Sequence, residues 1–191
     1  MRNASHFALA LSLLVTLRAA AADNDLDRLM AALAEHTRGH VSFVEQDYLA
    51  VLDRPVEASG ELLYERPDRL EKRTLVPRPA SLILEKGNLT IQSGRRKRVL
   101  ALRDYPQIAP FIESIRATLA GDRAALEQVF QLSFEGSLAR WTLSLVPLDA
   151  KLQGVVREIR IEGARDELQT VTILQADGDR SVMVIGSSIP P

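Results

Sequence analysis

The sequence predicts a mainly β protein of the α+β class, in which a curved antiparallel sheet closes over a few helices. About ten segments alternate apolar and polar residues with the period of two that strands have, and turn residues separate them. Two apolar stripes with a helical period interrupt this pattern, one near the N-terminus and one in the middle of the chain. Because several strands carry apolar residues on both faces, as in residues 168–174 and 181–185, we expect strong curvature.

Residues 1–22 have the parts of a secretory signal peptide. Arg2 supplies positive charge, residues 7–17 form an apolar core, and residues 19–22 supply small side chains for cleavage. The apolar core is too short for a membrane span. We therefore predict a cleaved signal peptide over residues 1–22 and a single domain over residues 23–191.

The composition limits the compartment and the partners of the protein. The chain has no cysteine, so it can form neither a disulfide nor a lipid anchor at the cleavage junction. A secreted domain without disulfides fits the bacterial periplasm. Of the 24 basic residues, Arg2 and Arg18 leave with the signal peptide, so that against 25 acidic residues the net charge becomes −3. This balance gives no support to a nucleic-acid partner.

The first predicted helix covers residues 23–38. Its apolar residues recur at spacings of three and four and form one stripe, which consists of Leu26, Leu29, Met30 and Leu33. Gly39 is expected to end this helix. His36 and His40 lie on either side of that glycine and share no helical face, so we expect solvated side chains and no metal site.

Strands follow the first helix, with Gly87-Asn88 as one of the turns. They are expected at residues 41–52, 56–66, 70–75, 81–85, 89–93 and 99–103. Before the last of them, the segment from Gly94 to Arg98 places four cations at a predicted hairpin tip. Such a tip is either a solvated surface or a docking patch for an acidic partner or for lipid headgroups.

The second half of the chain begins with helices. After Pro106 comes the second helical stripe, which ends at Gly121 and consists of Ile108, Phe111, Ile112, Ile115 and Leu119. Asp122 can cap a short third helix. The remaining strands are expected at residues 132–134, 141–145, 155–162, 168–175 and 181–185.

The segment from Gly60 to Leu75, GELLYERPDRLEKRTL, contains an internal conflict. The alternation of a strand places Leu62, Tyr64 and Arg66 on one face. A guanidinium group on an apolar face needs acceptors or water, because an unpaired buried charge is strongly unfavourable. Arg66 therefore belongs either to a surface hairpin, where it forms a salt bridge, or to a lined cavity that supplies acceptors.

The order of these parts resembles that of the LolA-like periplasmic lipoprotein carriers. The shared features are the N-terminal amphipathic helix, Phe43-x-x-Gln46 on the first strand, and Gly60-x-Leu62-x-x-x-Arg66-Pro67 on the second. The late segments Gly163-Ala-Arg-Asp166 and Asp177-Gly-Asp-Arg-Ser181 are also similar to the family. The resemblance covers essentially all of residues 23–191.

This resemblance implies an unclosed β-barrel with a helical lid over a hydrophobic cavity. In the family the arginine of the Arg-Pro pair points inward and hydrogen-bonds to the lid, so Arg66 is the expected lid switch. With few aromatic residues in the chain, the pocket would be aliphatic. The expected wall consists of Leu62, Tyr64, Leu82, Leu84, Leu89 and Ile91, with Phe111, Ile112 and Ile115 on the lid. The same residues could instead form an ordinary core.

The implied function is to carry the acyl chains of outer-membrane lipoproteins from the inner to the outer membrane. The implied partners are an acylated cargo, an inner-membrane donor complex and an outer-membrane acceptor. The cargo is a lipoprotein or another envelope lipid, such as a glycolipid or a lipid-linked polyketide. We expect a monomer that uses no cofactor, no metal and no catalytic residue.

Two other classes of function compete with a carrier. An enzyme is disfavoured because the chain has no Gly-x-Ser-x-Gly motif and no cysteine nucleophile. A lipid-sensing interaction domain, like that of the RseB-type regulators of envelope stress, is the stronger alternative. Those regulators carry a second domain, whereas one domain is predicted here, and this favours the carrier.

Overall fold

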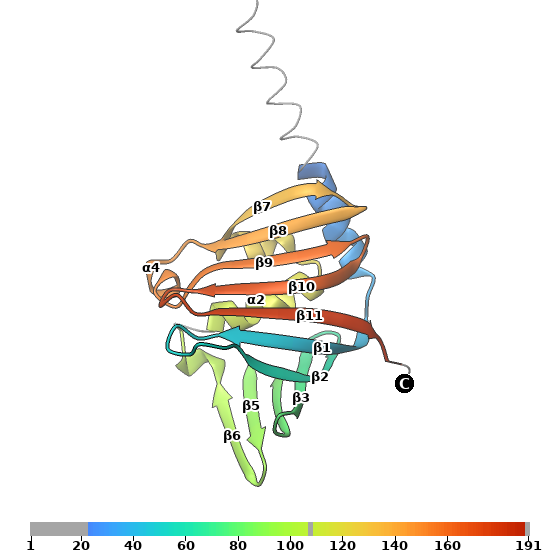
Figure 1. Ribbon diagram of the computed structural model, residues 1–191. Coiled ribbons are helices and arrows are strands. Elements are labelled where there is room, and N and C mark those ends of the chain that lie inside the picture. The colour runs from blue at the N-terminus through green and yellow to red at the C-terminus, as the bar shows by residue number, and fades with distance from the viewer. Residues whose placement is uncertain (1–22, 107–108, 190–191) are drawn as a thin grey trace, which may run out of the picture.

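A single antiparallel sheet of eleven strands forms the body of the protein (Figure 1). The computed structural model describes residues 23–106 and 109–189. The strand order is β6-β5-β4-β3-β2-β1-β11-β10-β9-β8-β7, so the first and last strands pair at the centre of the sheet. Strands β6 and β7 form the two edges and do not pair with each other. The predicted fold class is therefore confirmed: a mainly β protein whose sheet is an unclosed barrel accompanied by helices.

The elements follow the predicted order with shifted bounds. The N-terminal helix covers residues 23–34. The first six strands and the 3₁₀ turn η1 are β1 (Arg38–Tyr48), β2 (Val56–Glu65), β3 (Arg69–Val76), β4 (Ala80–Glu85), β5 (Asn88–Ser93), β6 (Arg96–Ala101) and η1 (Leu102–Asp104). The remaining elements are α2 (Ala109–Leu119), α3 (Arg123–Glu127), β7 (Phe130–Ser137), β8 (Arg140–Pro147), α4 (Ala150–Gln153), β9 (Val156–Ala164), β10 (Glu167–Gln175) and β11 (Arg180–Ser188).

Several local predictions were wrong at the ends of elements. The N-terminal helix ends at residue 34, and Gly39 lies in β1. The turn between β4 and β5 consists of Lys86 and Gly87, both at positive φ, which is the geometry of a tight hairpin turn. Helix α4 had no prediction, although Asp149 caps it by accepting hydrogen bonds from two backbone amides. The predicted signal peptide and Ile108 lie outside the described residues.

The basic segment after β5 also differs from its prediction. Only Gly94 and Arg95 form the turn, and Arg96, Lys97 and Arg98 belong to strand β6. Gly94 has a φ of 56°, which a two-residue hairpin turn requires and which glycine adopts without strain. Three of the four cations therefore alternate between the two faces of an edge strand.

The register of the sheet defines one continuous inner face. Residues directly opposite each other in an antiparallel pair share a face. From Leu143 this face passes through Ile161, Val171 and Met183 to Glu45, and along β1 to Phe43 and Val41. From Val41 it continues through Leu62, Lys72, Leu82 and Ile91 to Arg98 on the far edge.

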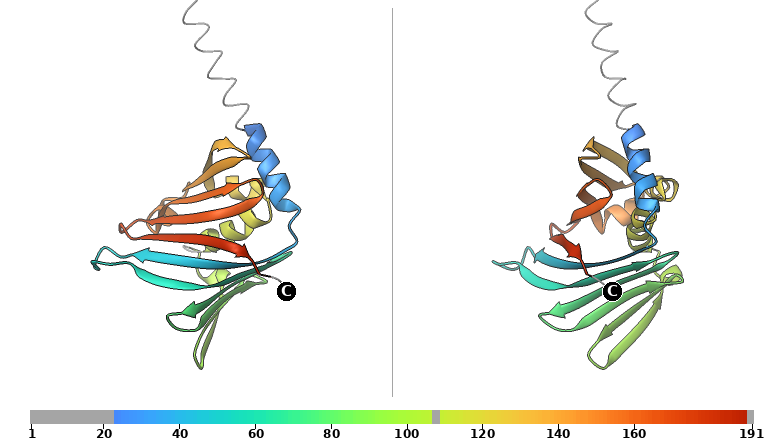
Figure 2. Two further views of the ribbon diagram at one scale, coloured as in Figure 1. Left: turned by 45° about the vertical axis from the view of Figure 1, so that its right-hand side comes forward. Right: turned by 90° about the vertical axis from the view of Figure 1, so that its right-hand side faces the viewer.

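The hydrophobic core occupies one half of this inner face. The apolar stripe of the N-terminal helix packs against Trp141, Leu143 and Leu145 of β8 and against β9, and α2 and α3 add Ala117 and Leu126. Figure 2 shows the helices gathered on one side of the sheet, with β4–β6 extending beyond them. The core is thus built from β7–β10 and the helices, and the other half of the sheet contributes little to it.

Two contacts fix the helices to each other. Gly121, at a φ of 66°, lies so close to the N-terminal helix that a Cβ atom there would approach the Met30 carbonyl oxygen to 2.1 Å. Arg123 at the start of α3 forms ion pairs with Asp23, Asp27 and Glu127. The carboxylates raise the pKa of Arg123 above its ordinary value, with the hydrogen bond to Glu127 as the main cause. The helices therefore form one unit over β7–β10.

Candidate functional site

The six residues predicted for a cavity wall all lie on the inner face of β2–β5. The cross-strand register arranges this region in three rows. The first row consists of Tyr64, Leu70, Leu84, Leu89 and Leu100, and the second of Leu62, Lys72, Leu82, Ile91 and Arg98. The third row consists of Gly60, Thr74, Ala80, Ser93 and Arg96. The inner face thus changes from apolar in the first row to polar and basic in the third.

Burial follows the same gradient. Tyr64 and Leu84 in the first row are buried, although neither belongs to the core cluster of the other half. Leu62, Leu89 and Ile91 are half-buried, and 39% of Leu82 is exposed. Turn η1 lies beside the first row, because the Leu102 amide donates to the Gly87 carbonyl at 2.9 Å. The second row therefore presents aliphatic surface that the folded chain leaves partly uncovered.

The three residues predicted for a lid lie on α2. Phe111, Ile112 and Ile115 are half-buried, and Phe111 packs against the core cluster. A pocket of about 50 Å³ lies between α2, α3 and β7, with Pro110, Ala117 and Phe130 among its lining residues. Pockets for small molecules are several times larger. This pocket is too small for an acyl chain. Because Phe111 packs against the core cluster, this part of α2 belongs to the packed half.

Arg66 connects the two helical ends that face β2. Its Nη1 donates to the Ala34 carbonyl oxygen at 2.5 Å and its Nη2 to the Ala120 carbonyl oxygen at 3.2 Å. These carbonyls close the N-terminal helix and follow α2, where the helix dipole favours a cation. The residue is exposed, and no carboxylate of the described chain pairs with it. Its partners are helix carbonyls, as the family resemblance implies, and its role as a switch remains a prediction.

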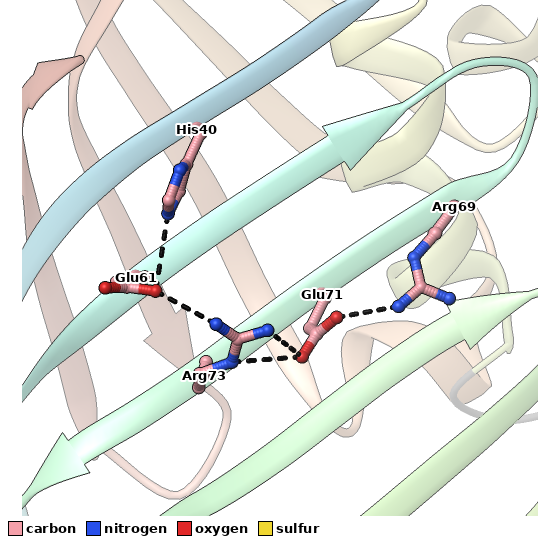
Figure 3. A network of polar contacts seen from close by, with 5 residues as sticks. All are labelled: His40, Glu61, Arg69, Glu71 and Arg73. Atoms are coloured by element: carbon pink, nitrogen blue, oxygen red, sulfur yellow. Dashed lines mark hydrogen bonds and ion pairs between the residues drawn. The ribbon is translucent and has the colours of Figure 1, made fainter. Parts of the chain in front are cut away.

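The outer face of β1–β4 carries a network of charged side chains (Figure 3). Glu71, of which 5% is exposed, accepts from Arg69 at 2.8 Å and from Arg73 at 3.1 Å. Arg73 also pairs with Glu61, which His40 contacts at 3.3 Å. These charged groups therefore satisfy one another across three strands of the outer face.

Sequence reasoning missed the polar contacts of the inner face. Lys72 forms an ion pair with the buried Glu45, which also accepts from the Ser181 hydroxyl at 3.2 Å. The Lys72 ammonium group lies 5.2 Å from the centre of the Phe43 ring. The hydroxyl of Tyr64 is buried and has no hydrogen-bond partner among the described residues. Strand alternation placed Tyr64 on this face with Leu62, and from Phe43 it could also have placed Glu45 there, but it gives none of their contacts.

The two histidines of the described residues, His36 and His40, are both paired with carboxylates. His36 Nε2 lies 2.8 Å from Asp166 Oδ2, and this hydrogen bond lowers the pKa of Asp166 below its ordinary value of 3.8. His40 pairs with Glu61 as described above. Across residues 23–106 and 109–189, no group of three or more metal-ligating side chains gathers in one place.

Comparison with known families identifies the chain. A family model described as "Outer membrane lipoprotein carrier protein LolA-like" matches residues 18–189. The chain belongs to this LolA-like family. A search among curated proteins finds no match to it. In the part of the chain that the structure describes, no helix is long and apolar enough to cross a membrane.

Several solved structures are similar to this LolA-like chain at low sequence identity. A LolA superfamily protein from Nitrosomonas europaea is 11% identical, with 89% of this chain and 93% of that chain covered and a TM-score of 0.49. The chain matched in the MucA/MucB complex of Pseudomonas aeruginosa is 14% identical, with 87% of this chain and 59% of that chain covered and a TM-score of 0.46. The lipoprotein LppX of Mycobacterium tuberculosis is 10% identical, with 85% of this chain and 96% of that chain covered and a TM-score of 0.42.

Proposed function

We propose that this LolA-like protein carries the acyl chains of a lipoprotein or a related envelope lipid across the periplasm, on the inner face of β1–β6. The main support is the placement of the aliphatic residues. Leu62, Leu82 and Ile91 lie on the side of the sheet that faces the helices, outside the packed core, and are partly exposed. Membership of a family of lipoprotein carrier-like proteins suggests the class of cargo.

The energetics of transfer favour a binding face of this kind. Burial of hydrocarbon contributes about 0.8 kcal/mol per methylene group relative to water. Relative to a bilayer the difference is close to zero, because lipid tails are already in an apolar environment. A carrier therefore needs an aliphatic surface that competes with both membranes without trapping the cargo, and donor and acceptor proteins give the transfer its direction.

The buried hydroxyl of Tyr64 adds a polar requirement. A buried hydroxyl without a partner costs about 1–3 kcal/mol relative to one that is paired. A polar acceptor on the bound cargo could pair with this group. The cargo would thus carry an acceptor that reaches the first row, and would not be a plain hydrocarbon.

The first test is to identify what the protein holds in the cell. The chain with its signal peptide is expressed in a Gram-negative host, purified from the periplasm without detergent, and extracted with organic solvent for mass spectrometry. We expect an acylated species in the extract. Protein that is free of lipid in every preparation would contradict a carrier and would favour an interaction domain.

Two adjacent leucines provide a matched pair for the same assay. Leu62 and Leu63 are both half-buried on β2, but Leu62 lies on the inner face and Leu63 on the outer face. We expect Leu62→Asn to lower the amount of bound lipid per protein at least several-fold, and Leu63→Asn to leave it close to wild type. Equal losses in both variants would show that stability, and not the inner face, controls lipid content.

A further inference from the structure

The edge strand β6 places two arginines on the aliphatic inner face. Arg98 lies opposite Ile91, and Arg96 lies opposite Ser93, so both share the face of Leu82 and Leu100. Lys97 lies opposite Gln92 and therefore points to the outer face. Strand alternation thus divides the three cations of β6 into two on the inner face and one on the outer face.

The charges of Arg96 and Arg98 are free to meet a ligand. Both residues are exposed, and within the described parts of the chain neither forms an ion pair or a side-chain hydrogen bond. The other cation of these rows, Lys72, is already neutralised by Glu45. The inner face of β2–β6 therefore ends in two uncompensated positive charges.

The spacing of these groups fits one anionic headgroup. Residues two apart along a strand are about 7 Å apart, so the two guanidinium groups can reach the same phosphate. Neighbouring strands are about 4.8 Å apart, which puts Ile91 one strand and Leu82 two strands from Arg98. A lipid with its headgroup at β6 can lay its acyl chain across β5 and β4 toward the first row.

We propose that Arg96 and Arg98 form a headgroup site that selects acylated molecules with an anionic headgroup, such as a phosphate or a carboxylate. This inference rests on the proposed function, because it assumes that the acyl chain lies on the inner face. To the proposed function it adds that the headgroup of the cargo is anionic and that the acyl chain extends from β6 across β5 and β4. Arginine forms paired hydrogen bonds with phosphate and carboxylate oxygens, which gives the site both charge and geometry.

The test compares two lysolipids that differ in headgroup charge. Delipidated protein is loaded with N-phenyl-1-naphthylamine, a neutral fluorescent probe of apolar sites, and the probe is displaced with myristoyl lysophosphatidylglycerol or myristoyl lysophosphatidylcholine below their micelle concentrations. For Arg96→Gln/Arg98→Gln we expect about tenfold weaker binding of the anionic lipid at low salt. Binding of the zwitterionic lipid should change by less than about twofold.

Lys97→Gln is the matched control, since it removes a charge from the same strand on the opposite face. We expect it to leave the affinity for the anionic lipid within about twofold of wild type. An equal loss in Lys97→Gln would show general attraction to the basic hairpin and would overturn the site. An unchanged affinity in the double arginine variant would also overturn it.

Two further arms separate the sources of binding. Glycerol 1-phosphate, which has the charge without the acyl chain, should leave the probe bound, and displacement by it would contradict a site that needs both parts. If neither lysolipid displaces the probe from wild-type protein, the proposed function fails as well. If both displace it equally from wild type and from the double variant, only the headgroup site is wrong.

Discussion

Strands β7–β10 and strands β2–β6 both present aliphatic residues at alternate positions of the inner face, yet only the first group is packed under helices. Leu143 and Leu145 of β8 are fully buried against the N-terminal helix, whereas Leu62 and Ile91 are half-buried and Leu82 is exposed. The difference shows that the strand pattern creates an apolar face, and that this face becomes core only where helices pack on it. One half is packed as the core, and the other half keeps aliphatic side chains that are partly uncovered.

The largest expected effect comes from removing the same side-chain atoms in each half. Leu143→Ala should lower the free energy of unfolding by about 2–5 kcal/mol, because it leaves a cavity in the packed half. Leu82→Ala should cost less than about 1 kcal/mol, because its side chain is already partly in water. Chemical denaturation gives both values, and a cost at position 82 that equals the cost at position 143 would contradict two distinct halves.

A second prediction concerns the connection between the halves. Arg66→Leu removes two charge-assisted hydrogen bonds to the carbonyls of Ala34 and Ala120. The closed, empty arrangement becomes less stable and competes less well with the arrangement that holds the cargo. We expect a fluorescent lipid to stay bound longer and its transfer to acceptor liposomes to slow at least several-fold. Faster or unchanged transfer would mean that Arg66 is not a switch.

The neighbouring Arg69 supplies the control for that experiment. Within the described residues its hydrogen bonds and ion pairs go to Glu71 and Glu85, and none goes to a helix. Arg69→Leu should therefore lower stability without slowing lipid transfer. If it slows transfer as much as Arg66→Leu, the slowing reflects a general loss of stability.

The smallest effect is a pH dependence confined to the packed half. The hydrogen bond with His36 places the pKa of Asp166 below 3.8 in the folded protein, so the contact stabilises the fold above about that pH and is lost as the pH falls through the lowered value. Both side chains are nearly half exposed, which limits the contribution to about 0.5 kcal/mol. Asp166→Asn should reduce the change in unfolding free energy between pH 5 and pH 3 by about this amount, with lipid binding at neutral pH unchanged. A larger dependence in the variant would reverse the sign that we assign.

Much of the fold could be predicted because its signals are local. The stripe from Leu26 to Leu33 has a helical period. In the same way, the alternation in β2, β4 and β5 places the two wall residues of each strand on one face of that strand, and the register then joins the three pairs. The cap of α3 followed in the same way from Asp122, whose carboxylate accepts from the Ala125 amide. In each case, the residue and its partner are neighbours in the sequence.

The contacts between distant segments could not be predicted. Arg66 bonds to backbone carbonyls at positions 34 and 120, which have no signature in the sequence. The ion pair of Lys72 and Glu45 depends on the curvature of β1–β3, and the division of the sheet into two halves depends on where the helices rest. For the same reason the sequence alone does not distinguish the buried leucines of the core from the partly exposed leucines of the inner face.

The central claim is tested most directly by locating a bound lipid at single methyl groups. Doxyl-labelled stearic acid is titrated into protein with ¹³C-labelled Leu, Ile and Val methyl groups, and the loss of each NMR signal is measured. We predict early loss at Leu82, Leu84 and Ile91, with Leu143 and Leu145 of the packed half retained. Broadening centred on Leu143 and Leu145, or on the outer-face residues Leu63 and Ile83, would contradict the account.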